Sequence, residues 1–180
     1  MEKHLHFINI KACRISSKKY FFMVSFTFLL GLCSFNFTSA QSLKEYNKLI
    51  SEMSSSTDEA AQSQAVRLQK LATELQPSVY VSAEIKAFGG GAPVCAMVDG
   101  ASVAKIYTEN NLFNSVELLT IKIDQSGLAA PINLSTLTSF PNLKYIRLLC
   151  EYPISASQIE SMITRSNPAI IVCYLVSLPG

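Results

Sequence analysis

In the segment 41–77, apolar residues recur at the three- and four-residue spacing of amphipathic helices, in two separate runs. Ser42 and Glu45 have the spacing of a capping box at the start of the first run, and a second capping box starts at Ser56. Pro77 ends the second run, because the residue before a proline is disfavoured in the helical conformation. The pattern therefore predicts two helices.

Beyond these helices the spacing changes to strict alternation, which from Val79 to Phe88 predicts a strand with one buried face. Four short apolar runs then predict strands at 94–98, 118–123, 143–149 and 170–176. Segments with helical spacing lie between them, at 103–107, 134–140 and 155–163. A strand and a helical return repeated every 25 to 27 residues is typical of a solenoid repeat.

One of these units carries a family pattern. Residues 134–148 read Leu134-x-x-Leu137-x-x-Phe140-Pro141-x-Leu143-x-x-Ile146-x-Leu148, which resembles one leucine-rich repeat. Two weaker copies read Leu118-x-x-Ile121-x-Ile123 and Ile170-x-x-Cys173-x-Leu175. The resemblance covers residues 94–178 and implies an α/β fold in which N-terminal helices precede a short parallel sheet of strand–helix repeats. A compact α/β domain would give the same order of elements and stays an alternative.

The first 40 residues have the three parts of a secretory signal. Five basic residues precede an apolar run at 20–32, and the small residues Ser39 and Ala40 follow. We expect cleavage after Ala40, with an uncleaved membrane anchor as the alternative. The junction before Gln41 resembles signal peptides of the Bacteroidetes type, which implies a periplasmic or secreted protein of a bacterial envelope.

Removal of this leader changes the charge of the chain. The whole sequence has a formal net charge of +2, but the leader holds five basic residues and one acid, so residues 41–180 carry −2. We therefore expect no nucleic-acid partner and no membrane span after cleavage. The expected organisation is a signal peptide at 1–40, a helical segment at 41–77 and a repeat-like α/β domain at 78–180.

The remaining residues offer little for catalysis. Both histidines lie in the leader, so residues 41–180 cannot form a Ser–His–Asp triad or a histidine-ligated metal site. Cys95, Cys150 and Cys173 lack close pairing, and Cys173, in an inward position equivalent to Ile146, is interpreted as a buried, unreactive thiol. Cys150 and Cys173 lie at positions too far apart along neighbouring strands for a disulfide. We expect no catalytic residue, no metal and no cofactor.

One group of side chains indicates binding instead. If Ile121 and its equivalents point into the core, then Lys122, Arg147 and Tyr174 fall in register on the opposite face, with Tyr145 beside them. Tyrosine and arginine on a rigid sheet are typical of binding hot spots. The alternative is that residues 42–75 cover this face, because the last strand is apolar on both sides.

The sequence thus predicts an exported, non-enzymatic interaction module that binds a protein or glycan partner. A structural subunit of a cell-envelope assembly, whose final strand is completed by a neighbour, is the first alternative. A small envelope enzyme that uses carboxylates or a tyrosine is the second.

Overall fold

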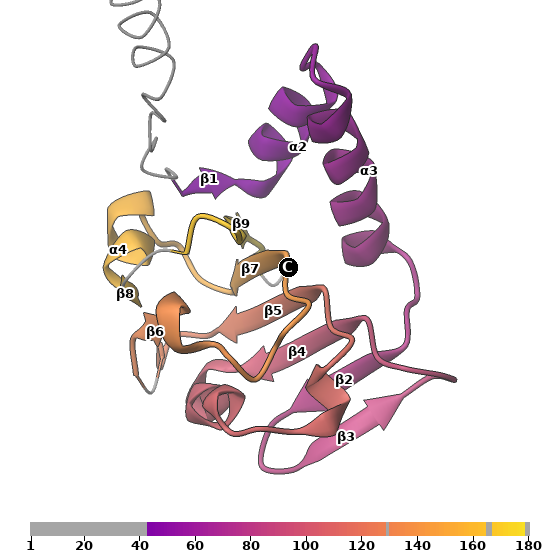
Figure 1. The fold of residues 1–180 in the computed structure, drawn as a ribbon. Coiled ribbons are helices and arrows are strands. Elements are labelled where there is room, and N and C mark those ends of the chain that lie inside the picture. Colours follow the sequence, from indigo (N-terminus) through magenta and orange to yellow (C-terminus); the bar gives the residue numbers. More distant parts are fainter. Residues whose placement is uncertain (1–42, 129, 165–166, 179–180) are drawn as a thin grey trace, which may run out of the picture. The chain divides into compact units, whose positions relative to one another are not determined.

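The computed structural model describes residues 43–128, 130–164 and 167–178, so the predicted signal segment lies outside the described residues. Seven strands form one sheet in the order β1-β9-β7-β5-β4-β2-β3 (Figure 1), and every neighbouring pair is parallel except β2 and β3. The strands are β1 Lys44–Glu45, β2 Ser78–Val81, β3 Ile85–Phe88, β4 Cys95–Asp99, β5 Leu118–Ile123, β7 Tyr145–Cys150 and β9 Ile171–Val176. Two further short strands, β6 Ile132–Asn133 and β8 Ile163–Thr164, pair with each other. The expected mixed α/β fold with a parallel sheet is confirmed.

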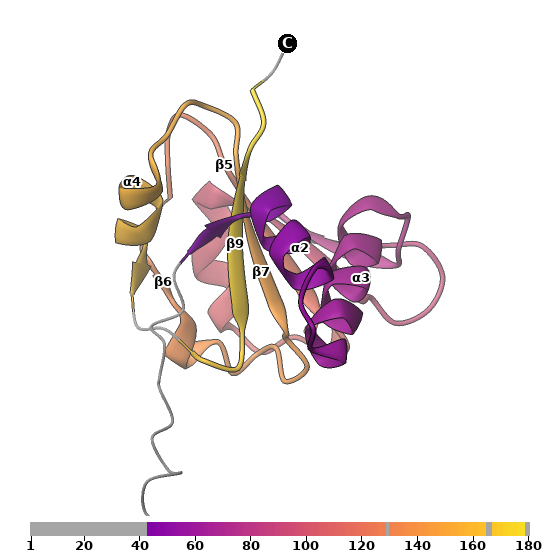
Figure 2. The ribbon, with the colours of Figure 1, turned by 90° about the horizontal axis from the view of Figure 1, so that it is seen from above.

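The helices lie on both sides of this sheet (Figures 1 and 2). On one side are α2 Tyr46–Ser54 and α3 Glu59–Thr73; α4 Ala156–Ser161 and the 3₁₀ helices η1 Gly100–Tyr107, η2 Asn111–Phe113 and η3 Leu134–Thr136 belong to the returns between strands. Asp58, rather than the predicted Ser56, caps α3, and Ser155 and Gln158 form a capping box at α4. Among the described residues, no helix has the length and apolar character needed to cross a membrane.

The returns between strands bury the first of two cores. Inward side chains of the central strands, such as Val98, Ile121 and Leu148, are fully buried there. The rings of Phe113 and Phe140 stack beneath them with their centroids 4.4 Å apart. Strands β5, β7 and β9 therefore lie side by side and parallel, as predicted, because each short return carries the chain back to the start of the next strand.

The two N-terminal helices bury the second core on the opposite face. Leu68 and Leu71 of α3 pack against Leu118, Tyr145 and Cys173 of the sheet, and all five are less than 9% exposed. A strand covered on both faces has apolar residues in both alternating positions, as β9 does. We refer to the two sides of the sheet as the return face and the helix face.

The single strand predicted from Val79 to Phe88 is wrong. The chain reverses after Val81, and β2 and β3 form an antiparallel hairpin in which Val81 pairs with Ile85. The reversal takes three residues, so the alternation of apolar and polar positions continues through it without a break. Because the turn leaves the alternation of apolar and polar residues unchanged, the sequence pattern does not show where the first strand ends.

The predicted side-chain directions in β9 are also wrong. Cys173 pairs with Arg147 and lies in the helix-face core, whereas Tyr174 pairs with Leu148 and packs against the return-face core. Since β9 is apolar in nearly every position, its sequence does not determine which of its two alternating sets of side chains faces which core. A shift of one residue moves every side chain of a strand to the other face.

Candidate binding site

A row of side chains crosses the helix face from strand to strand. Tyr80 of β2 pairs with Met97 of β4, Met97 pairs with Thr120 of β5, and Thr120 pairs with Arg147 of β7. Because these residues are direct neighbours on adjacent strands about 4.8 Å apart, their side chains form a continuous floor. The floor carries apolar, hydroxyl and guanidinium groups in one line.

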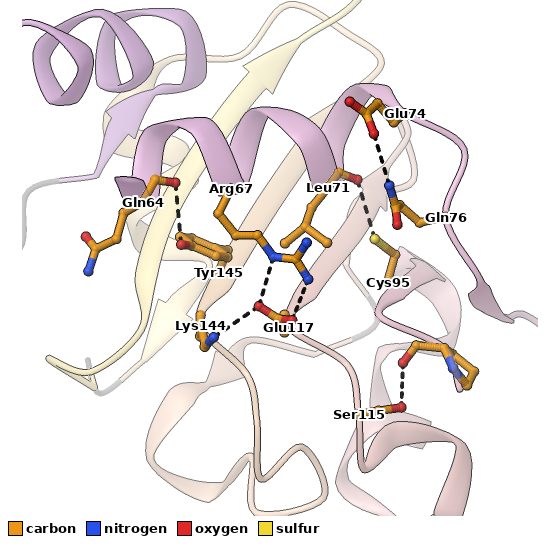
Figure 3. Close-up of polar contacts among 11 residues, drawn as sticks. Gln64, Arg67, Leu71, Glu74, Gln76, Cys95, Ser115, Glu117, Lys144 and Tyr145 are labelled. Atoms are coloured by element: carbon orange, nitrogen blue, oxygen red, sulfur yellow. Dashed lines mark hydrogen bonds and ion pairs between the residues drawn. The ribbon is translucent and has the colours of Figure 1, made fainter. Parts of the chain in front are cut away.

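Helix α3 covers this floor only in part. Its last turn and the segment after it supply Leu71, Ala72 and Leu75 as one wall of a cleft of about 320 Å³, whose floor is the row from Tyr80 to Arg147. We call this hollow the α3 cleft. Leu71, Glu74 and Cys95, which border it, are visible in Figure 3 at the end of α3.

The border of the α3 cleft is apolar and exposed. The side chain of Leu75 is fully exposed, and those of Phe88 and Met97 are 55% and 36% exposed. Among the described residues, five large hydrophobic side chains are exposed, and these three all line the cleft. Clustered exposed hydrophobic side chains mark interaction sites, whereas single ones need no explanation.

Arg147 lies at the end of the floor, and no acidic side chain of the described residues forms an ion pair with it. Its Nη1 donates a 3.4 Å hydrogen bond to the carbonyl of Ala72, and its guanidinium carbon lies 5.9 Å from the centre of the Tyr46 ring. Its Nε is buried and has no acceptor. Its terminal nitrogens, Nη1 and Nη2, therefore keep N–H donors for another partner.

Cys95 is the thiol of the cleft. Its Sγ lies 3.4 Å from the carbonyl oxygen of Leu71, to which it donates a hydrogen bond (Figure 3). Burial raises the pKa of this thiol, although Arg147 and Arg67 act in the opposite direction. A thiol that stays protonated at neutral pH is a poor nucleophile. Cys150 and Cys173 are free thiols as well, on opposite faces of the sheet.

The four predicted site residues do not come together. Tyr145 lies under α3, is 2% exposed, and donates a 3.4 Å hydrogen bond to the carbonyl of Gln64 (Figure 3). Burial raises the pKa of the Tyr145 hydroxyl. The prediction that the sheet face is open at Tyr145 is therefore wrong. The structure agrees here with the alternative that residues 42–75 pack over this face.

Of the other three, only Arg147 belongs to the α3 cleft. Lys122 lies on the same face but pairs in register with Leu149, and its Nζ forms an ion pair of 3.1 Å with Glu151. Tyr174 lies on the return face, so Arg147 contacts the ring of Tyr46 rather than that of Tyr174. The predicted alignment of Lys122, Arg147 and Tyr174 is wrong.

A second hollow of about 560 Å³ lies between the start of α3 and the loop before β9. Its two charged residues, Arg67 and Lys144, are already paired with the carboxylate of Glu117: Arg67 donates hydrogen bonds of 2.6 and 3.2 Å, and Lys144 donates one of 3.1 Å (Figure 3). The hydrogen bonds from Arg67, followed by the one from Lys144, hold the pKa of Glu117 below its usual range. This group serves to attach α3 to the sheet.

Sequence reasoning missed the apolar border of the cleft. Leu75 fits the apolar side of the second helix, and Phe88 falls on the polar side of the predicted strand, so neither stood out. A phenylalanine among the polar positions of an alternating strand was the one available signal. In the part of the chain that the structure describes, no three His, Cys, Asp or Glu side chains gather as metal ligands would.

Comparison of the chain with protein-family models, with curated proteins and with solved structures finds no match.

Proposed function

We propose that this chain is an exported, non-enzymatic interaction module and that its partner is a protein bound at the α3 cleft. The observation that carries the proposal is the exposed apolar border formed by Leu75, Phe88 and Met97. These side chains favour a protein over a glycan, because sugar hydroxyl groups need hydrogen-bond partners that apolar side chains do not supply. The basic, apolar and small-residue parts of residues 1–40 support export.

The ionisable groups of the cleft support binding rather than catalysis. Burial keeps the Cys95 thiol protonated, and Glu74 is exposed on the border, where its carboxylate lies 3.9 Å from the Nζ of Lys70. A general acid–base pair needs two groups with matched pKa values in reach of one substrate atom. Cys95, Glu74 and Arg147 do not provide such a pair.

The strand pattern supports the resemblance to leucine-rich repeats, which we retain as part of the proposal. Strands β4, β5, β7 and β9 start 23 to 27 residues apart, and each lies next to the one before it along the chain. Their returns all contribute to the core of the return face. Repeat proteins of this kind use the surface of their stacked elements for binding.

The structural-subunit alternative has less support from the edges of the sheet. Strand β9, which was expected to be completed by a neighbouring molecule, pairs with β7 on one side and with β1 on the other. Strand β3 ends the sheet at the opposite side, but it is only four residues long and carries Lys86. Short, charged edge strands resist pairing with other chains.

A photo-cross-linking amino acid at Leu75, Phe88 or Met97 tests the proposal in cells. We expect each of the three positions to give the same discrete cross-linked protein adduct. Val66 is the matched control, because it is an apolar residue of α3, is 66% exposed, and does not line the cleft. The proposal is wrong if the three positions give no adduct, or if Val66 gives the same one.

A further inference from the structure

Arg147 poses a physical problem that the described residues do not solve. A guanidinium stays charged at any physiological pH, and burying part of it removes water that its donors need. Its contacts in the structure are one long hydrogen bond to the carbonyl of Ala72 and the ring of Tyr46. The Nε donor is buried without an acceptor, although the residue is only half-buried and faces the α3 cleft.

The following acidic side chains of this side of the molecule interact with other groups than Arg147. Glu117 accepts from Arg67 and Lys144, and Glu151 pairs with Lys122. The carboxylate of Asp99 accepts a 2.6 Å hydrogen bond from the hydroxyl of Tyr80, and the carboxylate of Glu74 lies near Lys70. An anion that reaches Arg147 therefore has to come from outside the described residues.

The surroundings of Arg147 limit what this anion can be. A planar guanidinium matches a carboxylate through two parallel hydrogen bonds. The walls next to it are apolar, from Leu71 and Leu75, and the floor continues through Thr120 to Met97. The volume of about 320 Å³ lies at the lower end of the range for ligand pockets, roughly 300–1,000 Å³. A carboxylate attached directly to a small apolar group fits these conditions.

We infer that the α3 cleft binds the C-terminal carboxylate of its protein partner, with Arg147 as the carboxylate-binding residue and the last apolar side chain of the partner against Leu71 and Leu75. This inference rests on the proposed function and specifies which part of the partner enters the cleft. The C-terminal residue of a chain carries both a carboxylate and its own side chain. The rest of the partner extends out of the cleft past the exposed side chains of Leu75, Phe88 and Met97. Capture of a terminal carboxylate is a recurring mode of peptide recognition.

The test uses isothermal titration calorimetry with two acetylated hexapeptides of five alanines and a final leucine, one with a free C-terminal carboxylate and one with a C-terminal amide. We expect the free acid to bind the exported protein at least tenfold more tightly than the amide. Arg147→Gln should erase this difference, and Arg147→Lys should retain part of it. Lys48→Gln is the matched control, because Lys48 is an exposed cation that lies outside the cleft and forms no ion pair among the described residues, and it should leave the difference unchanged.

A second pair of variants covers the case in which Arg147→Gln does not fold. Met97 is 36% exposed and lies in the same row as Arg147, so it tolerates a polar side chain. Met97→Glu and Met97→Gln both remove the apolar side chain, but only Met97→Glu brings a competing carboxylate to the cleft, so it should weaken binding of the free acid at least tenfold more than Met97→Gln does.

Three results would overturn the inference. Equal affinity of acid and amide would show that the carboxylate is not recognised. Absence of binding by both peptides, together with cross-linked adducts at Leu75, would leave the proposed function intact and remove only the chain-end assignment. Equal or tighter binding of octanoate, tested as a third ligand, would show that the cleft takes free fatty acids rather than a polypeptide end.

Discussion

Glu117 and Arg147 are charged residues of neighbouring strands or strand ends, yet their surroundings differ. Glu117 accepts hydrogen bonds from two cations, Arg67 of α3 and Lys144 before β7, and its side chain is 17% exposed. Arg147 has a backbone carbonyl and an aromatic ring in place of an acid. A carboxylate with two charged donors stabilises the fold, whereas a cation without an acid is available to a ligand.

We predict that Glu117→Gln lowers the free energy of unfolding by about 1–2 kcal/mol at neutral pH, since a hydrogen bond to a charged group contributes about 1.5–3 kcal/mol and Arg67 is partly exposed. The pKa of Glu117 is lowered in the folded protein. Its contribution is therefore present above the unfolded-state pKa and is lost as the pH falls through the lower, folded-state value.

Urea denaturation of Glu117→Gln at neutral pH and at about pH 2.5 checks this, because the difference from the unaltered protein should shrink at the acidic pH. Glu109→Gln is the control, as Glu109 is exposed and takes part in no ion pair among the described residues. An equal loss of stability at both pH values would contradict the role given to the Glu117 carboxylate.

Helix α3 has two functions at the scale of the element. Its inner side carries Leu68 and Leu71, which are buried against the sheet, and its last turn forms the wall of the α3 cleft. The hydrogen bonds between Arg67 and Glu117 fix the helix along its length (Figure 3). The position of the cleft wall therefore depends on how firmly the inner side of α3 is packed.

We predict that Leu68→Ala destabilises the protein by about 2–5 kcal/mol, because Leu68 is fully buried and its truncation leaves a cavity under α3. Val66→Ala, on the exposed side of the same helix, should change stability by about 0.5 kcal/mol or less. Chemical denaturation of both variants measures the contrast. Similar losses for the two would mean that α3 does not pack in the described orientation.

At the scale of the whole molecule, the sheet depends on the N-terminal segment. Strand β1 pairs with β9, and helices α2 and α3 cover Leu118, Tyr145 and Cys173. These residues belong to the central part of the sheet, so the segment 41–77 completes a core that the residues 78–180 cannot close alone. Exposed apolar surface of this kind favours association and loss of cooperative unfolding.

We predict that a fragment of residues 78–180 binds a hydrophobic dye and that its Cys173 reacts with a thiol reagent, whereas Cys173 of the whole protein resists modification. Burial raises the pKa of Cys173 to about 12 in the folded protein, so its thiolate is scarce at neutral pH. Mass spectrometry of the modified cysteines gives the comparison. A fragment in which Cys173 stays protected and the dye does not bind would show that residues 78–180 fold without the helices.

The local pattern alone was sufficient for most elements. The two N-terminal helices and the strands β4, β5, β7 and β9 follow from periodicity, because it depends on residues close in the chain, although Glu45 and Asp58 cap the helices instead of the predicted serines. The parallel order of β5, β7 and β9 followed as well, since one short return between strands allows little else. Periodicity also separated the faces of β7, where buried Ile146 and Leu148 alternate with half-buried Arg147 and Leu149.

The position and the lining of the candidate binding site depend on contacts between residues that lie far apart in the chain. Whether α3 covers Tyr145 and leaves Met97 open depends on where this helix comes to rest against strands far from it in the chain, which no local pattern encodes. The direction of Tyr174 depends on how β9 pairs with β7, because an apolar strand fits either core until its neighbour fixes the register. Arg147 forms no ion pair among the described residues, whereas Glu117, Glu151 and Glu74 pair with other cations, and only the folded chain assigns those partners.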